Sequence, residues 1–358
     1  MIKKYSTQKW EGLYKSNNVA GPDQFTCCRY YEELGESLSL VDLLLTNESL
    51  GVRPIVMFGD EAVKRKYLSK LSTGECTVAW CLSEERCGSD PTCVHTSAAR
   101  LSGDNGPEQW SVSGSKTWVT SAQEAQLLLV FARTETSDES EGLTCFLIDK
   151  SEIDPSSVTI SQPKTLAGFR GSEVCDVVFD QCILSENSVL GGVGDGLKII
   201  QAVTNKHKYL QAFPIIKYLK KLLKETIEHC NSRTQFGQPL SEFSLVRSEL
   251  GKMSAALYAL ESVAYMTAGL EDAALEPDIE VESVITRQLA TDTAHTIITG
   301  CLKLLGSQVN LESSKYQQYL RDSEVLQHWQ GSANINKCFV AISCLQHLIQ
   351  AKPGKKII

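Results

Sequence analysis

The chain has 358 residues, of which 42% are hydrophobic and 22% are charged, a balance typical of a folded globular protein and not of a disordered one. Its formal net charge of −8 argues against a nucleic-acid partner, because neutralising phosphates needs a basic surface. The 13 cysteines are not spaced as metal ligands are, and the amino terminus does not resemble a secretory signal. The sequence therefore predicts reduced thiols and no metal site.

The amino-terminal part of the chain has apolar residues at helical spacing. Asp60 has the character of a helix N-cap and Gly74 that of a helix end, and similar start and stop signals frame the earlier segments. The predicted helices cover about residues 23–35, 37–45, 55–58 and 60–74. The first domain, residues 1–75, is therefore expected to be helical.

The hydrophobic pattern then changes from helical spacing to alternation. Eight short runs rich in β-branched and aromatic residues lie between residues 76 and 190 and predict an antiparallel barrel or sandwich. After the glycine-rich linker 191–196, long helical patterns return, and four helices of this length are expected to pack as a bundle. The predicted helices are 196–232, 241–272, 279–305 and 332–351, within a third domain of residues 191–358. The predicted fold class is thus α+β.

Residues Trp80–Thr120 combine hydroxyls, glycine-flanked amides and one large aromatic on β-rich segments. The hydroxyls belong to Ser83, Ser89 and Thr120, and the aromatic is Trp118. Such a set can hold a flat, hydrogen-bonding heterocycle such as a flavin against a sheet. The alternative for each serine is an ordinary strand or turn position, and for Trp118 a core aromatic.

Five segments in this order resemble the acyl-CoA dehydrogenase family over about residues 23–350. They are KRKYLSKLSTGE (64–75), CLSEERCGSD (81–90), GSKTWVTS (114–121), NSRTQFGQPLSEF (231–243) and LRDSEVLQHWQGSANI (320–335). The resemblance is to the very-long-chain branch, which includes the complex I assembly dehydrogenase. It implies FAD at the middle β domain, an acyl-CoA slot, a homodimer, mitochondrial location and electron transfer to electron-transfer flavoprotein. A targeting segment is not evident.

The family's site residues carry over position by position. The resemblance implies that Arg233 reaches the FAD diphosphate of a partner subunit, for which a guanidinium fork is suited. The remaining implied cofactor contacts are Leu82, Ser83, Ser89, Trp118, Thr120, Gln235, Gly306, Ser332 and Asn334. The implied substrate contacts are Ser89, Asn205, Lys208 and Gly331.

Two departures from the family pattern predict reduced FAD affinity. Gly306 is followed by Ser307, Gln308 and Val309 where the family has further glycines, and a β-branched valine is costly if φ must be positive. Glu85 replaces the usual proline and adds a negative charge beside an anionic cofactor.

The third departure concerns the catalytic base. The family removes an α-proton of the acyl-CoA with a glutamate, and Gln330 stands at that position in the turn Trp329–Ser332. Losing a positioned base costs about 10²- to 10⁴-fold in rate. His207, one residue before Lys208, is at the alternative base position of some family members and titrates near neutral pH. The favoured interpretation of residues 206–208 is a basic stripe that serves CoA phosphates, a lipid surface or water.

Three functions remain open from the sequence. The first is a working FAD-dependent dehydrogenase that uses His207. The second is a non-catalytic FAD- or acyl-CoA-binding scaffold that acts with mitochondrial complex I assembly factors. The third is a degenerate or truncated member of the family, since the usual first helices and the extra carboxy-terminal domain of the branch are missing.

Overall fold

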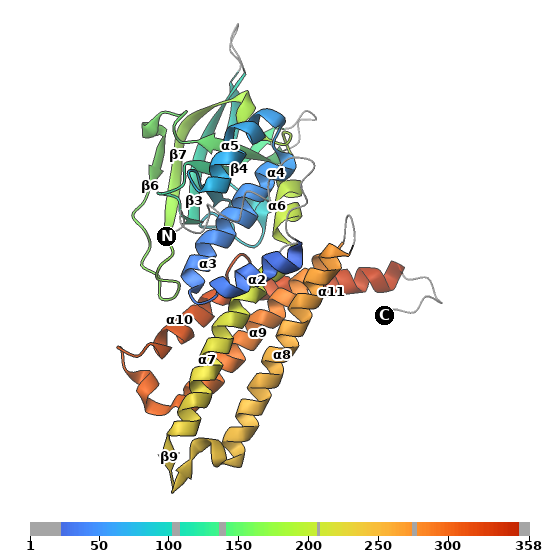
Figure 1. Ribbon diagram of the computed structural model, residues 1–358. Coiled ribbons are helices and arrows are strands. Elements are labelled where there is room, and N and C mark those ends of the chain that lie inside the picture. The colour runs from blue at the N-terminus through green and yellow to red at the C-terminus, as the bar shows by residue number, and fades with distance from the viewer. Residues whose placement is uncertain (1–22, 102–107, 136–140, 206–207, 274–277, 351–358) are drawn as a thin grey trace. The chain divides into compact units, whose positions relative to one another are not determined.

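The computed structural model describes residues 23–101, 108–135, 141–205, 208–273 and 278–350. The chain divides into two compact units. The first comprises Asp42–Leu166 and Arg170–Thr204, and the second comprises Asp23–Val41, Ala167–Phe169 and the chain from Asn205. The first unit holds a β-sheet and short helices, and the second holds long helices (Figure 1).

Within the described part of the first unit, eight strands form one sheet in the order β6-β7-β3-β2-β4-β5-β8, with β1 also paired to β4. Most pairings are antiparallel, as expected, whereas β1 and β2 each pair with β4 in parallel. The strands are β1 Val78–Cys81, β2 Ser97–Leu101, β3 Gln109–Thr120, β4 Leu127–Glu135, β5 Glu141–Asp149, β6 Val158–Ile160, β7 Val174–Ser185 and β8 Val189–Leu190.

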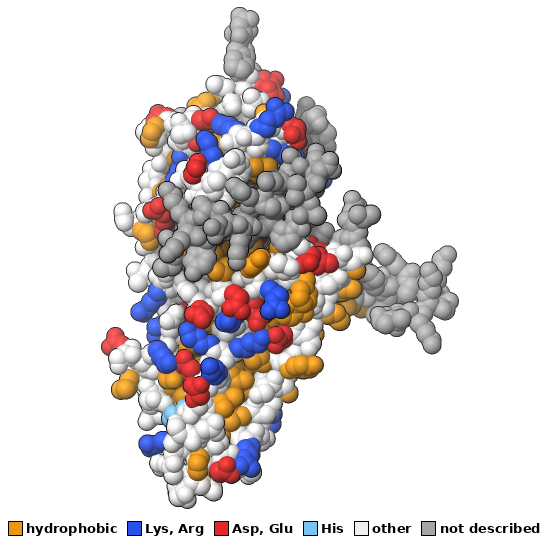
Figure 2. Space-filling view, viewed as in Figure 1, with side chains coloured by type: hydrophobic (Ala, Val, Ile, Leu, Met, Phe, Trp, Pro, Cys, Tyr) orange, Lys and Arg blue, Asp and Glu red, His pale blue; other side chains and the backbone are white. Residues whose placement is uncertain are grey.

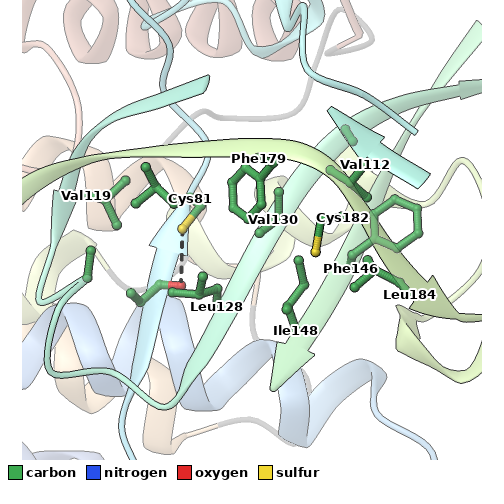
Figure 3. Close-up of a cluster of buried hydrophobic side chains, with 14 of the residues drawn as sticks. Cys81, Val112, Val119, Leu128, Val130, Phe146, Ile148, Phe179, Cys182 and Leu184 are labelled. Carbon is green, nitrogen blue, oxygen red and sulfur yellow. Dashed lines mark hydrogen bonds between the residues drawn. The ribbon is translucent and has the colours of Figure 1, made fainter. Parts of the chain in front are cut away.

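The central strand β4 is buried on both faces, which explains its continuous apolar sequence. On one face Leu128 and Val130 pack with apolar side chains from β3, β5 and β7 (Figure 3). On the other face Leu129 and Phe131 pack against short helices, including Tyr67. The sheet therefore has a hydrophobic core on each face, and β3 contributes side chains to the core that contains Leu128 and Val130.

A π-helix and three α-helices also belong to the described part of the first unit. A π-helix, Thr46–Val52, leads into α4 (Arg53–Phe58), and α5 (Glu61–Thr73) and α6 (Gly196–Thr204) follow. The Asp60 carboxylate accepts the Val63 amide at 2.7 Å, and Gly74 ends α5 with φ 71°. Both predicted caps of α5 are confirmed.

The second unit is a helical bundle in which α7, α8 and α9 contact one another (Figure 1). Its helices are α2 Gln24–Leu34, α7 Ala212–Ser232, α8 Ser244–Asp272, α9 Glu280–Leu305, α10 Tyr316–Leu326 and α11 Ala333–Gln350, and α3 (Leu38–Leu45) spans the boundary between the units. None of the helices that the structure describes is long and apolar enough to cross a membrane.

Two helix predictions in the bundle are wrong. The expected continuous helix 196–232 is divided into α6, a 3₁₀ turn at Lys208–Gln211 and α7, and α6 belongs to the sheet unit. Pro214 lies in the first turn of α7, the place where a helix tolerates proline, and it is the sequence signal for this break. Helix α10, polar on much of its surface, was not predicted.

Candidate functional site

Trp118 lies at a β-bulge near the end of β3. The pairing of β3 with β7 shifts between Lys116 and Val119, so two residues of β3 face one residue of β7. Simple alternation after buried Lys116 would bury Trp118, yet this residue is 63% exposed and its φ is 59°. A tryptophan in left-handed backbone conformation is strained, and such strain collects at functional sites.

Asp176 on β7 holds this bulge. Its carboxylate accepts the Thr117 hydroxyl at 2.5 Å and the Lys164 ammonium at 2.6 Å. These hydrogen bonds lower the pKa of Asp176. The Lys164 ammonium also lies 5.5 Å from the centroid of the Trp118 ring. The exposed Trp118 side chain is therefore held in two ways: Asp176 holds the neighbouring backbone through Thr117, and Lys164 contacts the ring.

A buried ion pair attaches the loop of Leu82 and Ser83 to β3. The Lys116 ammonium donates to the Glu84 carboxylate at 2.8 Å and to the Leu82 carbonyl at 3.2 Å. The Thr117 amide donates to the Ser83 carbonyl at 2.8 Å. Two predicted cofactor contacts, Leu82 and Ser83, are thereby joined to the strand that carries Trp118 and Thr120.

The ionisation of this pair follows from its burial. Burial alone would raise the Glu84 pKa, but hydrogen bonds from Lys116 and from the Thr96 and His95 amides outweigh it and lower that pKa to about 2. Burial lowers the pKa of Lys116, although Glu84 opposes this shift. Glu84 is therefore an anion throughout the physiological range.

The turn after Glu84 leaves Ser89 exposed together with Glu85 and Gly88. A Cβ added to Gly88 would meet no atom within 4 Å, so the backbone here is open to approach. Asp90 ends the turn by accepting the Thr92 amide at 2.9 Å. The predicted contact Ser89 is thus accessible, and the charge of Glu85 lies in the same exposed turn of the first unit.

In the bundle, the turn at the predicted base position has an unusual backbone. Gln330 has φ 52° and Gly331 has φ 127°, and the Trp329 side chain is buried. The Gln330 Oε1 accepts from Gln211 Nε2 at 2.5 Å. Gln211 Oε1 in turn accepts from Arg287 Nε. The predicted base position is therefore occupied by a half-buried amide that is hydrogen-bonded to the buried Gln211 side chain.

Arg287 supports the turn directly. One terminal nitrogen of its guanidinium donates to the Leu326 carbonyl at 2.6 Å and to the Trp329 carbonyl at 3.1 Å. Arg287 is only 2% exposed, and burial lowers its pKa to about 10. It therefore remains a cation at neutral pH and binds the last carbonyls before Gln330.

Lys208 is a second cation beside this turn. Its ammonium donates to Asn336 Oδ1 at 2.8 Å and lies 3.5 Å from a Cβ built on Gly331. Burial and the charge of Arg287 lower its pKa to about 8. Two predicted substrate contacts, Lys208 and Gly331, therefore lie together. His207, the predicted alternative base, lies outside the described residues.

Of the other predicted site residues in the bundle, Asn205 adjoins Lys208, whose amide donates to the Asn205 carbonyl at 3.3 Å. The Asn205 carbonyl accepts from the Ser283 hydroxyl at 2.8 Å. Arg233 ends α7 and is followed by an exposed two-strand hairpin, Thr234–Gln235 with Gln238–Pro239, that carries Gln235. Ser332 closes the Gln330 turn just before α11, and Asn334 lies in the first turn of α11. The structure therefore brings Lys208, Gln330 and Gly331 together, and it leaves Arg233 and Gln235 on a separate projection.

The loop after α9 corrects one expectation. The residue with positive φ is Gly306, at 76°, while Val309 is buried in a 3₁₀ turn and is absent from the positive-φ residues of the described chain. Valine is therefore not strained here. Gln308 Nε2 lies 3.5 Å from His229 Nδ1, so this loop adjoins the last turn of α7.

Sequence reasoning missed the supporting residues of both sites. Gln211 and Arg287 lie at buried helical positions, and Asp176 and Lys116 at strand positions, where apolar side chains are the norm. A buried charged or polar side chain is usually paired or hydrogen-bonded. These residues therefore indicate a supporting role only when their positions in the structure are known.

A cavity of about 550 Å³ lies in the first unit between the end of α5 and the ends of β4 and β5. Its lining includes Tyr67, Lys70 and Lys150, and none of the predicted site residues is among the described residues that line it. Among the residues that the structure describes, no three His, Cys, Asp or Glu side chains are grouped to hold a metal ion, and the absence of a metal stays a prediction.

Comparisons with known proteins identify the fold. Three sequence models match in order: the acyl-CoA dehydrogenase N-terminal domain at residues 2–75, the middle domain at 79–182 and the C-terminal domain at 194–345. The butyryl-CoA dehydrogenase structure from Megasphaera elsdenii superposes with a TM-score of 0.87, at 24% identity over 96% of this chain and 89% of that one.

Curated relatives include the mitochondrial very long-chain specific acyl-CoA dehydrogenases of Bos taurus and Homo sapiens. They are 29% and 28% identical over 92% and 88% of this chain. The chain spans about half the length of these relatives, 51% and 49% respectively. With all three domain models matched in order, the chain belongs to the acyl-CoA dehydrogenase family.

Proposed function

We propose that this protein binds FAD and an acyl-CoA thioester, and that its α,β-dehydrogenation is weakened or lost. The observation that carries the proposal is the amide of Gln330, which is tied to Gln211 and through it to Arg287. A carboxamide does not accept a proton at neutral pH, so this turn offers no general base of its own.

The residues of the first unit fit a flavin. Trp118 offers an exposed aromatic face that Asp176 and Lys164 hold in place, and flat heterocycles bind against such faces. Leu82, Ser83, Ser89 and Thr120 would supply the nearby backbone and hydroxyl contacts, and Arg233, Gln235, Gly306, Ser332 and Asn334 those of the bundle. When bound, FAD supplies an acceptor for the hydride of the substrate.

We infer that FAD affinity is reduced. The exposed Glu85 adds negative charge near an anionic cofactor, and Ser307–Val309 replace glycines that permit close backbone approach. For the thioester, Ser89, Asn205, Lys208 and Gly331 are the proposed contacts, and the Lys208 ammonium suits an anionic or carbonyl oxygen. His207 is the alternative base.

The deciding experiment is the visible spectrum of the purified protein before and after anaerobic addition of a long-chain acyl-CoA. The proposal expects a yellow protein whose absorbance does not bleach. Bleaching that disappears in His207→Ala would replace this function with a working dehydrogenase. Protein that stays colourless with added FAD would contradict the cofactor assignment.

The proposed partners follow from the family. A homodimer is supported by the outward-facing apolar residues of α8, among them Tyr258 and Met266. We further infer a mitochondrial location, since the curated very-long-chain relatives carry that name. Electron-transfer flavoprotein is the expected acceptor for an active form, and complex I assembly factors or a peripheral membrane surface are the partners of a non-catalytic scaffold.

A further inference from the structure

The Lys208 ammonium is hydrogen-bonded to a neutral group and not to a carboxylate. It donates to the amide oxygen Asn336 Oδ1 at 2.8 Å, and Asn336 is only 2% exposed. The backbone of Lys208 is held as well, because its amide donates to the Asn205 carbonyl at 3.3 Å. The amine is therefore held in position by a partner that lacks the negative charge that favours protonation.

Gly331 leaves one side of this amine uncovered. A Cβ built on Gly331 would lie 3.5 Å from Lys208 Nζ and 3.9 Å from Asn336 Oδ1, so the side chain of any other residue here would cover the nitrogen. Gly331 is exposed and has φ 127°, a conformation in which glycine is favoured. A ligand that contacts Gly331 would therefore also meet the Lys208 nitrogen.

The surroundings of Lys208 favour its neutral form. Burial and the positive charge of Arg287 on α9 lower the pKa of Lys208 to about 8, and Glu280 at the start of the same helix opposes this shift. An amine with this pKa is neutral in about a tenth of the molecules at pH 7, against less than about one in a thousand for an ordinary lysine. The neutral amine has a lone pair, and desolvation beside a second cation activates a lysine as a nucleophile.

We propose that Lys208 is a site of self-acylation, at which its amine takes the acyl group from an acyl-CoA thioester. The proposal rests on the proposed acyl-thioester site, of which Asn205, Lys208 and Gly331 are contacts. Nζ forms a bond to the thioester carbonyl carbon, the C–S bond breaks, and the departing thiolate takes up the proton that the amine loses. The products are free CoA and a neutral amide, so acylation removes the cation beside the turn and leaves the acyl chain attached there.

The first measurement is trace labelling of the full chain with acetic anhydride from pH 6 to pH 11, with each lysine quantified by peptide mass spectrometry. This reagent reacts with any accessible neutral amine and needs no binding site. Labelling of Lys208 is expected to be half-maximal near pH 8, whereas an ordinary lysine reaches that point near its usual pKa of about 10.4. A Lys208 profile that coincides with the average of the other lysines would overturn the proposal.

The second measurement is the intact mass of the full chain after incubation with octanoyl-CoA at pH 8, followed by peptide mapping. One octanoyl group on Lys208 is expected, at a rate that saturates with octanoyl-CoA concentration. Lys208→Arg keeps the positive charge but has no neutral form at this pH, so it should not gain this label. Lys198→Arg changes an exposed lysine of α6 and should be labelled at Lys208 as the wild type is.

Asn336→Asp tests the neutral partner of the amine. A carboxylate at this position would hold Lys208 as an ammonium, so octanoylation at pH 7.5 should be about tenfold slower or more. Gln346→Glu adds the same charge at an exposed position of α11 and should leave the rate unchanged. Equal rates in these two variants would mean that the partner of Lys208 does not control its reactivity, and would overturn the proposal.

A binding measurement distinguishes this proposal from the proposed function. The probe is S-octyl-CoA, a thioether that cannot transfer an acyl group, titrated calorimetrically into the wild-type protein. If S-octyl-CoA binds and octanoyl-CoA leaves no label on Lys208, self-acylation is overturned and the acyl-thioester site stands. If S-octyl-CoA does not bind, and the label on Lys208 increases with octanoyl-CoA concentration without saturation, the acyl-thioester site fails and the reactivity of Lys208 stands.

Discussion

At the scale of single residues, the surroundings of Gln330 would also accommodate a glutamate at this position. A glutamate at 330 would accept the Gln211 Nε2 donor in the same place, and Arg287 and Lys208 would keep it ionised. We expect Gln330→Glu to fold normally and to gain flavin bleaching by acyl-CoA by about 10²-fold or more, measured in anaerobic single turnover. Gln330→Met, which cannot ionise, should gain nothing. Equal bleaching rates in Gln330→Glu and Gln330→Met would show that a missing carboxylate at position 330 is not what limits the reaction.

Asp176 provides the second prediction at this scale. Its carboxylate holds Thr117 and Lys164 around the strained Trp118 bulge, so Asp176→Ala should release the ring from its fixed position. FAD affinity, measured by flavin fluorescence titration, should fall about tenfold or more, while Asp176→Asn, which retains an acceptor, should fall less. Identical losses in the two variants would mean that the carboxylate acts only through its charge.

The geometry of these candidate sites could not be predicted from the sequence. Trp118 and Gln330 are predicted site positions, but φ of 59° and 52° at these residues follows from a bulge and a turn fixed by distant partners. It placed the strain at Val309, whereas Gly306 takes the positive φ. Backbone conformation at such positions depends on tertiary contacts such as Asp176 with Thr117, which local patterns do not contain.

At the scale of elements, helix ends were predictable because capping is local. Gly74 was expected to end α5 and does so with φ 71°. We expect Gly74→Ala to destabilise the protein by about 1 kcal/mol, because alanine is strained in this conformation. Gly251 lies inside α8 with no atom within 4 Å of an added Cβ, so Gly251→Ala should stabilise by up to about 1 kcal/mol. Urea denaturation measures both, and shifts of the same sign would contradict the argument.

The ion pair that joins the Leu82–Glu84 loop to β3 makes stability depend on pH. The Glu84 pKa is about 2 in the folded protein, below the ordinary glutamate value of 4.5, so its contribution is complete above about 4.5 and is lost as the pH falls towards 2. Glu84→Gln should therefore flatten the acid limb of the stability curve in that window. It should also destabilise the protein at neutral pH by about 3 kcal/mol, because Lys116 stays buried without its partner. If Glu84→Gln lost stability at low pH in the same way as the wild type, other carboxylates would be responsible for that loss.

At the scale of the whole molecule, the order of helices, strands and helices was readable because hydrophobic periodicity persists over long segments. Packing groups the helices by their contacts: α4, α5 and α6 group with the sheet, whereas α2 groups with the bundle. These groupings depend on which helix faces become buried, as Tyr67 and Leu71 do against β4. The predicted boundaries at 75 and 190 follow changes of pattern along the chain and not this packing.

The surface of the bundle supports one prediction about assembly. Tyr258, Met266 and Leu270 lie on α8 at positions related by multiples of four, and the Tyr258 side chain is 74% exposed. Figure 2 shows hydrophobic side chains gathered on the bundle between charged ones. A stripe of large apolar residues on one helix face is typical of a contact with another chain, and the proposed homodimer would cover it.

We expect Tyr258→Glu with Met266→Glu to halve the mass measured by light scattering after size-exclusion chromatography, because charges are depleted from interface centres. The paired control, Lys252→Glu with Lys303→Glu, changes exposed charges on α8 and α9 and should leave the mass unchanged. A wild-type monomer, or a dimer unaffected by the α8 substitutions, would move the interface away from this helix.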